Sequence, residues 1–343
     1  MALLVDRAAG MLAGVAIGDA LGMPAEFLTA EQIRARYGSI ETLISPAPDH
    51  PHHLLRAGSV TDDTDHTLML AELMLDHGQI ESNQWAERLL AWSQTPRVQE
   101  NRFVGPSTLR ALATLQAGKP LDETPRGGTT VGAAMRVAAL AIACPNPADL
   151  IEQVVASCAI THYTNRAISG AMAMAFALSE TLRDSAVPDT VAHAAQEGAV
   201  VGRKYGDWSW TPAIERRIEY VMRWVRNDPE KAVLARLQDL IGVDLYPEQL
   251  VPNAIGLALL ARGDPWKAMK WAANLGGDTD TLASMAGSIC GGLNGLAAFG
   301  ETLLAQVEAV NNLDLRATAR RLVALRKGRP LLSANKRTAR TIL

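Results

Sequence analysis

The sequence predicts an all-α protein that forms a single compact multi-helix domain. Almost every segment spaces its apolar residues with the helical period, and the alternation of Val, Ile and Thr that is typical of strands is scarce. Hydrophobic residues make up 48% of the 343 residues, so the chain can bury a sizeable core. No regular repeat or linker divides the chain. We therefore expect one domain over residues 1–330, followed by a basic C-terminal tail over residues 331–343.

Capping residues and glycines predict where the helices begin and end. An apolar N-terminal segment around Gly18 predicts the first helix, and the segment "TLMLAELMLDHG" predicts a helix that ends at Gly78. Ser82 is a suitable N-cap for the next helix. The same period predicts further helices over residues 107–117, 130–143, 148–160, 165–183, 189–204, 212–227, 229–241, 252–261, 264–273, 280–294, 299–311 and 313–327.

Two segments are rich in small residues. Residues 170–178 and 281–298 consist largely of Ala, Gly, Ser and Met. Small side chains allow helix axes to approach closely, so we expect both segments at the centre of the helical domain.

Charge and cysteine content restrict the function classes. The net charge of −3 argues against a general nucleic-acid binder, which would carry a basic surplus. Cys144, Cys158 and Cys290 lie far apart in apolar surroundings, which predicts buried free thiols in a reducing cytoplasm. The N-terminal segment lacks a basic n-region and carries Asp6 and Asp19, unlike a signal peptide. The longest uncharged apolar run is built from small residues, so no membrane association is predicted.

Two acidic segments carry the chemistry. "TDDTDHTLML" at residues 61–70 and "GGDTDTLASMAG" at residues 276–287 each place several carboxylates and hydroxyls on the first turn of a helix. Capping a helix N-terminus needs one acceptor side chain, worth about 1 kcal/mol, and does not account for three or four such side chains. Like charges this close raise one another's pKa unless a cation neutralises them. Oxygen ligands favour Mg²⁺, Mn²⁺ or Ca²⁺. The sequence thus predicts a binuclear cation site shared by two facing helix starts.

The motifs together resemble the ADP-ribosylglycohydrolase family. "GMLAGVAIGDALGMPAE", "TDDTDHTLML", "GAAMRVAALAI", "THYTNRAISGA" and "NLGGDTDTLASMAGSICGGLNG" follow one another in family order from about residue 8 to residue 298. The resemblance implies a compact all-α domain with a central site for two Mg²⁺ or Mn²⁺ ions. It also implies hydrolysis of an N- or O-glycosidic bond at a ribosyl anomeric carbon, with release of ADP-ribose from a modified protein or small molecule.

The resemblance implies two overlapping sets of metal ligands. One ion would be held by Thr61, Asp62, Asp63 and Asp280, and the other by Asp278, Asp280 and Thr281. Glu26 matches the family glutamate that acts as the base in some members, and Asp62 or Asp63 is the alternative base. Without the resemblance, we would expect Glu26 to be an exposed loop carboxylate. Asp19 is expected either to orient the site from a buried position or to accept a hydrogen bond at a helix end.

The resemblance also implies a substrate-binding segment. "RGGTTVGAAMRVAAL" is similar to the Gly-rich stretch of the family that contacts diphosphate and ribose, and "THYTN" is similar to its histidine motif. The implied substrate contacts are Gly127, Gly128, Thr130, Gly132, Met135, Arg136, His162 and Gly277. Two alternatives stay open at this point. Arg136 pairs either with a phosphate or with a structural partner, and His162 either touches the ligand or serves as a capping or core residue.

Three departures from the family pattern widen the range of functions. Val131 replaces the usual Asn, Ala139 replaces the usual Pro, and Phe103 and Val104 stand before Gly105 where some members carry an acid. These changes leave open a hydrolase of a small nucleoside or ribosyl metabolite. A non-catalytic, crystallin-like binding protein is a further alternative. The sequence does not predict whether the protein is a monomer or a dimer.

A loop rich in proline and histidine precedes the first acidic segment. Residues 44–60, "ISPAPDHPHHLLRAGSV", carry no periodicity. His50, His52 and His53 resemble a metal trap by composition, but the flanking prolines favour a mobile loop. We therefore expect no role for these histidines in the metal site.

Overall fold

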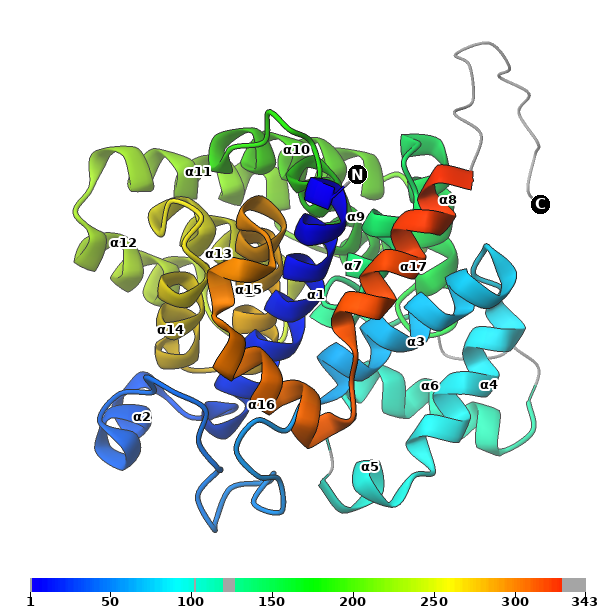
Figure 1. Ribbon diagram of the computed structural model, residues 1–343, viewed down its shortest axis with the longest axis horizontal. Helices are drawn as coiled ribbons and strands as arrows, with labels where there is room; N and C mark the ends of the chain where they lie inside the picture. The colour runs from blue at the N-terminus through cyan, green and yellow to red at the C-terminus, as the bar shows by residue number, and fades with distance from the viewer. Residues whose placement is uncertain (1, 102, 120–126, 329–343) are drawn as a thin grey trace.

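The computed structural model describes residues 2–101, 103–119 and 127–328, and it confirms the all-α prediction (Figure 1). The helices are α1 (Ala2–Gly22), α2 (Ala30–Tyr37), α3 (Asp62–His77), α4 (Ser82–Ser93), α5 (Pro96–Asn101), α6 (Pro106–Gln116), α7 (Ala138–Ala143), α8 (Pro147–Cys158), α9 (Asn165–Thr181), α10 (Pro188–Gly202), α11 (Ile214–Asn227), α12 (Glu230–Arg236), α13 (Pro247–Leu260), α14 (Pro265–Leu275), α15 (Thr279–Asn294), α16 (Glu301–Asn311) and α17 (Leu315–Gly328). The predicted tail, residues 331–343, lies outside the described residues.

Two predicted helices differ from the structure for local reasons. Residues 130–143 form a short 3₁₀ helix at Val131–Ala133 and turns before α7, because Gly132 disfavours a helix and the Val131 amide donates to Leu245 O at 2.8 Å. Helix α13 begins five residues earlier than predicted, at Pro247, and contains Pro252. Since Pro252 has no N–H, the Glu248 carbonyl lacks its helical donor, and Arg217 Nη1 donates to it at 2.8 Å instead.

The centre of the molecule is the crossing of α1 and α15. Four glycines recur at every fourth position of α1 and face the backbone of α15, namely Gly10, Gly14, Gly18 and Gly22. A Cβ atom on Gly14 would lie 2.1 Å from Gly287 O, and one on Gly18 would lie 2.2 Å from Ala283 O. The two backbones are therefore in direct contact, and only a residue without a side chain fits between them.

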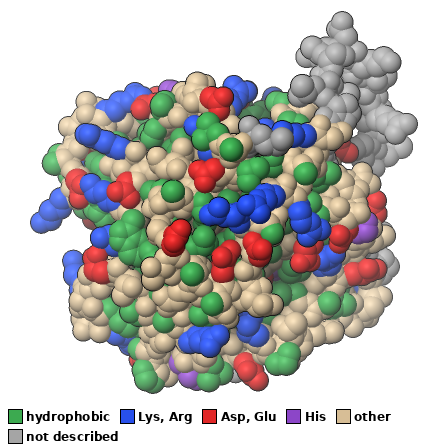
Figure 2. Space-filling view, in the orientation of Figure 1, with side chains coloured by type: hydrophobic (Ala, Val, Ile, Leu, Met, Phe, Trp, Pro, Cys, Tyr) green, Lys and Arg blue, Asp and Glu red, His purple; other side chains and the backbone are tan. Residues whose placement is uncertain are grey.

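The predicted central position is confirmed for residues 170–178 of α9 and residues 281–292 of α15, which lie almost wholly in the core. Asn294, Ala297 and Ala298, at the end of the second predicted segment, are exposed. The three cysteines are buried and form no disulfide, as expected. Among the described residues, one helical stretch, Ala2–Ala25, is apolar and long enough to cross a membrane, and 100% of its apolar window is buried inside the fold. Acidic and basic side chains intermingle over the face seen in Figure 2.

Candidate functional site

The C-terminal end of α1 holds the start of α3 through one carboxylate. Asp19, with no exposed surface, accepts hydrogen bonds from Thr61 N at 2.9 Å and Thr61 Oγ1 at 2.8 Å. It also accepts from Thr64 N at 3.1 Å and Thr64 Oγ1 at 2.5 Å. Asp19 thus satisfies free backbone donors at the start of α3 and orients Thr61. Both expectations for Asp19, an orienting carboxylate and an acceptor at a helix end, are confirmed in one residue.

A turn with two left-handed glycines brings the start of α15 to the same place. Gly276 and Gly277 have φ values of 84° and 76°, which only glycine adopts readily. The backbone of this turn is held from two sides. Phe27 N donates to Gly277 O at 2.8 Å, and Asp278 N donates to Val243 O at 2.9 Å. Asp278 and the first turn of α15 are therefore fixed against the segment that follows α1.

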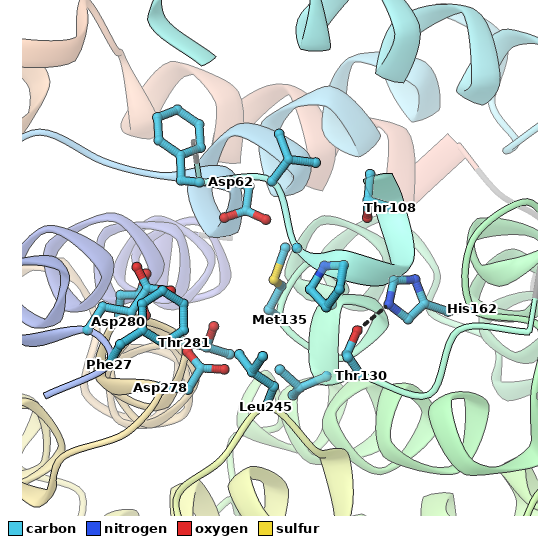
Figure 3. A pocket seen from close by; sticks show the side chains of 17 residues that line it. Phe27, Asp62, Thr108, Thr130, Met135, His162, Leu245, Asp278, Asp280 and Thr281 are labelled. Carbon is cyan, nitrogen blue, oxygen red and sulfur yellow. Dashed lines mark hydrogen bonds between the residues drawn. The ribbon is translucent and has the colours of Figure 1, made fainter. Parts of the chain in front are cut away.

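The two acidic segments meet in space, as the sequence predicts. Thr281 Oγ1 donates to Asp63 Oδ2 at 3.1 Å, although these residues are 218 positions apart. Thr61 Oγ1 lies 3.5 Å from Asp280 Oδ2. The carboxylates of Glu26, Asp278 and Asp280 each offer one oxygen, and these oxygens lie within 4.8 Å of one another. In Figure 3, Asp62 lies across the opening from Asp278, Asp280 and Thr281.

In the acidic cluster of Glu26, Asp62, Asp63, Asp278 and Asp280, three carboxylate oxygens have no hydrogen-bond partner among the described residues. These buried atoms are Asp63 Oδ1, Asp278 Oδ2 and Asp280 Oδ1. A buried anionic oxygen without a partner is costly, and here several stand together. Carboxylates and threonine hydroxyls are the ligands that Mg²⁺ and Mn²⁺ prefer. The residues present therefore fit a divalent cation site.

Burial and mutual repulsion raise the pKa values of these acids. Burial, followed by the charge of Asp280, raises the pKa of Asp19 to about 7. The same two causes raise the pKa values of Glu26, Asp62 and Asp63 well above the ordinary range. The pKa of Asp278 is raised in the same way. Without a cation, the cluster therefore retains protons at pH values where free carboxyl groups have lost theirs.

This retention predicts how stability depends on pH and metal. The folded state binds more protons than the unfolded state, so the stability of the metal-free protein should fall as pH rises from about 4, the ordinary carboxyl pKa, through about 7, the pKa of Asp19. A bound cation replaces the lost protons, so Mg²⁺ or Mn²⁺ should stabilise the protein more at pH 8 than at pH 5. Thermal melts in chelator and in metal test this, with an expected gain on the order of 5 °C or more at pH 8. Equal melting temperatures with and without metal at pH 8 would contradict it.

The acidic cluster forms one end of a pocket whose other walls are mostly apolar. Of the implied substrate contacts, Thr130, Gly132, Met135 and His162 line this pocket. Thr130 Oγ1 and His162 Nε2 are 2.9 Å apart and face the pocket opposite the carboxylates (Figure 3). The full lining is Glu26, Phe27, Asp62, Phe103, Val104, Gly105, Pro106, Thr108, Thr130, Val131, Gly132, Met135, His162, Leu245, Asp278, Asp280 and Thr281.

Three glycines of the implied contact set, Gly127, Gly128 and Gly277, do not line the pocket. Gly127 pairs with His162 in an isolated bridge, which sets the Gly-rich segment against the histidine motif. A Cβ atom on Gly128 would lie 2.1 Å from Thr161 O, and one on Gly277 would lie 2.0 Å from Val243 O. The structure therefore gives Gly128 and Gly277 a packing role, since each allows two segments of the site to approach closely.

Arg136 is not at the pocket, which corrects the expected phosphate contact. Its side chain is fully buried, and Nη2 donates to Ser157 O at 2.8 Å and to Thr161 Oγ1 at 3.1 Å. Its guanidinium carbon lies 5.0 Å from the centre of the Trp85 ring. Burial lowers its pKa to about 10. Of the two alternatives, the structure therefore supports a structural Arg136, although its partners are a carbonyl, a hydroxyl and a ring and not a carboxylate.

Asp65 belongs to the first acidic segment by sequence and not by position. It accepts a hydrogen bond from Trp92 Nε1 at 2.7 Å and forms an ion pair with Arg97. Asp65 comes two positions after Asp63, about 200° further round the helix, so these two carboxylates point to different faces of α3. Asp65 is therefore a packing residue of the α3–α5 region.

The histidine loop is the main feature that sequence reasoning missed. His50 and His52 are 2% and 1% exposed, so the expectation of a mobile loop is wrong for these residues. His50 Nε2 lies 3.0 Å from Glu26 O, and His52 Nε2 forms a short contact with Glu26 Oε2. The sequence offered one sign of this, the concentration of histidines directly before the first acidic segment. The partner of these histidines lies more than twenty residues earlier, which no local pattern reveals.

Known proteins share both the sequence pattern and the fold. A family model described as ADP-ribosylglycohydrolase matches residues 1–331. The uncharacterized protein YegU of Escherichia coli (strain K12) is 32% identical over 335 residues, which cover 94% of this chain and 98% of that protein. The ADP-ribosyl-[dinitrogen reductase] glycohydrolase of Rhodospirillum rubrum is 31% identical over 158 residues, 46% of this chain and 51% of that protein. A solved structure titled "ADP-ribosylglycohydrolase-related protein complex" matches with a TM-score of 0.68 and 25% identity, over 95% of this chain and 100% of that chain.

Proposed function

The chain belongs to the ADP-ribosylglycohydrolase family, and on this basis we propose that it hydrolyses a glycosidic bond at a ribosyl anomeric carbon and releases ADP-ribose from a modified protein or small molecule. One observation carries the proposal. Two acidic helix starts from distant parts of the chain meet at the end of a pocket, with carboxylate oxygens that lack partners. A protein without catalysis has little need for such a costly arrangement.

The proposed metal site comprises both acidic segments. Two divalent cations, Mg²⁺ or Mn²⁺, would be held by Thr61, Asp62, Asp63, Asp278, Asp280 and Thr281. A bound divalent cation neutralises the carboxylates and polarises the sugar oxygens that reach it. Asp19 acts from outside this set, because its hydrogen bonds fix the hydroxyl of Thr61 in place.

Glu26 is the proposed general base. Its side chain lines the pocket beside Asp278 and Asp280, and burial, followed by the charge of Asp280, raises its pKa, which makes it a stronger base than a free carboxylate. The bond between the anomeric carbon and the leaving nitrogen or oxygen breaks, and the leaving group keeps the electron pair. The oxygen of a water molecule bonds to that carbon, Glu26 takes one proton of the water, and the leaving group takes up a proton from solvent. The neighbouring carboxylates stabilise the positive charge that develops on the sugar ring. Thr130 and His162 would contact the far side of the substrate.

A substrate panel tests this function. We expect the protein with Mg²⁺ or Mn²⁺ to release free ADP-ribose from ADP-ribosylated arginine peptides, ADP-ribosylated serine peptides or O-acetyl-ADP-ribose, and to stop when a chelator is added. Chromatography with mass detection distinguishes ADP-ribose from ribose. No release from any compound, together with no metal-dependent stabilisation, would favour a non-catalytic binding protein.

The pocket wall favours one second candidate, hydrolysis of a small nucleoside or ribosyl metabolite. Phe103, Val104 and Val131 line the pocket where some family members carry an acid or an amide. An apolar wall suits an uncharged base or leaving group. Free ribose released from nucleosides, without any release of ADP-ribose, would replace the first proposal with this one.

A further inference from the structure

The loop before α3 holds Glu26 by both its backbone and its side chain. His50 Nε2 faces Glu26 O at 3.0 Å, and His52 Nε2 faces Glu26 Oε2. The two histidines are also joined to each other, since His52 N donates to His50 Nδ1 at 3.1 Å. All three residues are buried, so water does not compete for these contacts. The loop therefore fixes the position of Glu26 from the side away from the pocket.

The hydrogen-bond pattern fixes the orientation of the His52 ring. Its Nδ1 lies 2.8 Å from Asn101 O, and a carbonyl oxygen only accepts, so Nδ1 carries a hydrogen. The ring can then turn only one atom, Nε2, toward Glu26 Oε2. The His52 ring also packs edge-on against Phe103, with centroids 6.2 Å apart. Because the ring is held both at Nδ1 and by its contact with Phe103, Nε2 points in one direction.

The backbone around Glu26 gives its side chain little other support. Glu26 directly follows a 3₁₀ turn at Met23–Ala25. The next residue, Phe27, has a φ of 64°, a backbone conformation that residues other than glycine rarely adopt. A glutamate has three side-chain torsions, so a carboxylate aimed at a reaction needs a partner that restricts them. In this structure that partner is His52, which contacts Oε2 of the pocket-lining Glu26.

We propose that His52 is a positioning residue for the reaction, which holds the Glu26 carboxylate in the direction required of a base, with Asn101 and His50 as its supports. This inference rests on the proposed function, in which Glu26 takes the proton of the attacking water. His52 itself does not line the pocket and touches no substrate. Its effect reaches the reaction through Glu26 alone.

A matched pair of substitutions separates positioning from packing. In His52→Asn, the side-chain amide nitrogen stands near the former Nδ1, so the bond to Asn101 O is kept and the contact with Glu26 is lost. In His52→Gln, the side-chain amide stands near the former Nε2, so a hydrogen-bonding partner for Glu26 Oε2 is kept. We expect kcat to fall by about 10²-fold in His52→Asn with KM changed little, because a misplaced base loses part of its contribution to proton transfer. In His52→Gln, kcat should recover to within about 10-fold of wild type.

A second measurement does not depend on turnover. In protein labelled with ¹⁵N, the imidazole resonances of His52 should report a hydrogen on Nδ1, and Glu26→Gln should shift the Nε2 resonance strongly. A double-mutant cycle of His52→Asn and Glu26→Gln on thermal unfolding should show coupling between the two residues. The resonance measurement also serves if His52→Asn fails to fold, since it is made on wild type and Glu26→Gln.

The outcomes separate this inference from the proposed function. Equal kcat in wild type and both His52 variants would overturn the positioning role. Loss in His52→Gln with retention in His52→Asn would overturn it too, because the contact with Asn101 would then be the one that matters. A wild-type protein without activity on any substrate would refute the proposed function, and a His52 resonance unmoved by Glu26→Gln would then refute the pairing separately.

Discussion

The double variant Asp278→Asn plus Asp280→Asn is expected to lose metal-dependent hydrolysis by at least about 10³-fold in kcat/KM, the scale of losing preorganised electrostatic stabilisation. Asp280 is central, because its charge is, after burial, the next cause of the raised pKa values of Asp19, Glu26, Asp62, Asp63 and Asp278. Amides in place of both carboxylates remove two negative charges and the oxygen pair beside Glu26. Steady-state assays and a metal titration by calorimetry measure the loss.

The same variant should be more stable than wild type when both are free of metal at pH 8. The change removes electrostatic repulsion among buried acids and therefore raises the stability of the metal-free protein. A gain in stability together with a loss of activity is expected only if the acids are kept for metal binding although they destabilise the fold. Asp65→Asn is the matched control. It makes the same chemical change on the first turns of α3, yet Asp65 faces Trp92 and Arg97. Retained metal-dependent turnover in the double variant would refute the binuclear scheme.

Sequence patterns predicted the parts of this site that depend on local chemistry. An excess of carboxylates and hydroxyls at 61–63 and 278–281 favours a shared cation whatever the fold, so their meeting in space could be expected. Helix period and small residues likewise predicted the core position of α9 and α15. In both cases the composition of one segment limits what can surround it.

Contacts set by the partner segment could not be predicted in this way. The histidine loop has no periodicity, and its burial depends on Glu26 and on the carbonyl of Asn101. Arg136 looks like an anion ligand in the sequence, and only the position of Trp85 and Ser157 shows that it points into the core. When a side chain has two possible partners in the sequence, only the packing of the fold shows which of them it contacts.

Substitution of Gly14 in α1 is expected to have the largest effect on folding. A Cβ atom there would lie 2.1 Å from the carbonyl oxygen of Gly287, far inside van der Waals contact, and both atoms belong to rigid helix backbones. Neither helix can move without disturbing its neighbours, because α15 also packs on α9, α13 and α14. Gly14→Ala should destabilise the protein by more than about 3 kcal/mol, and Gly14→Val should largely prevent folding. Circular dichroism melts measure both.

The expected loss extends from the fold to the metal site, because the same two helices carry both. Asp19 lies one turn beyond Gly14 on α1, and Asp280 lies on the first turn of α15, so any separation of the axes moves the two acids apart. Gly14→Ala protein that still folds should therefore gain less stability from Mn²⁺ than wild type. Gly328→Ala is the control, since it adds the same methyl group to a helical glycine whose added Cβ would meet no other part of the described residues within 4 Å. If Gly14→Ala and Gly328→Ala melted alike, the direct backbone contact of α1 and α15 could not be what holds the acidic cluster together.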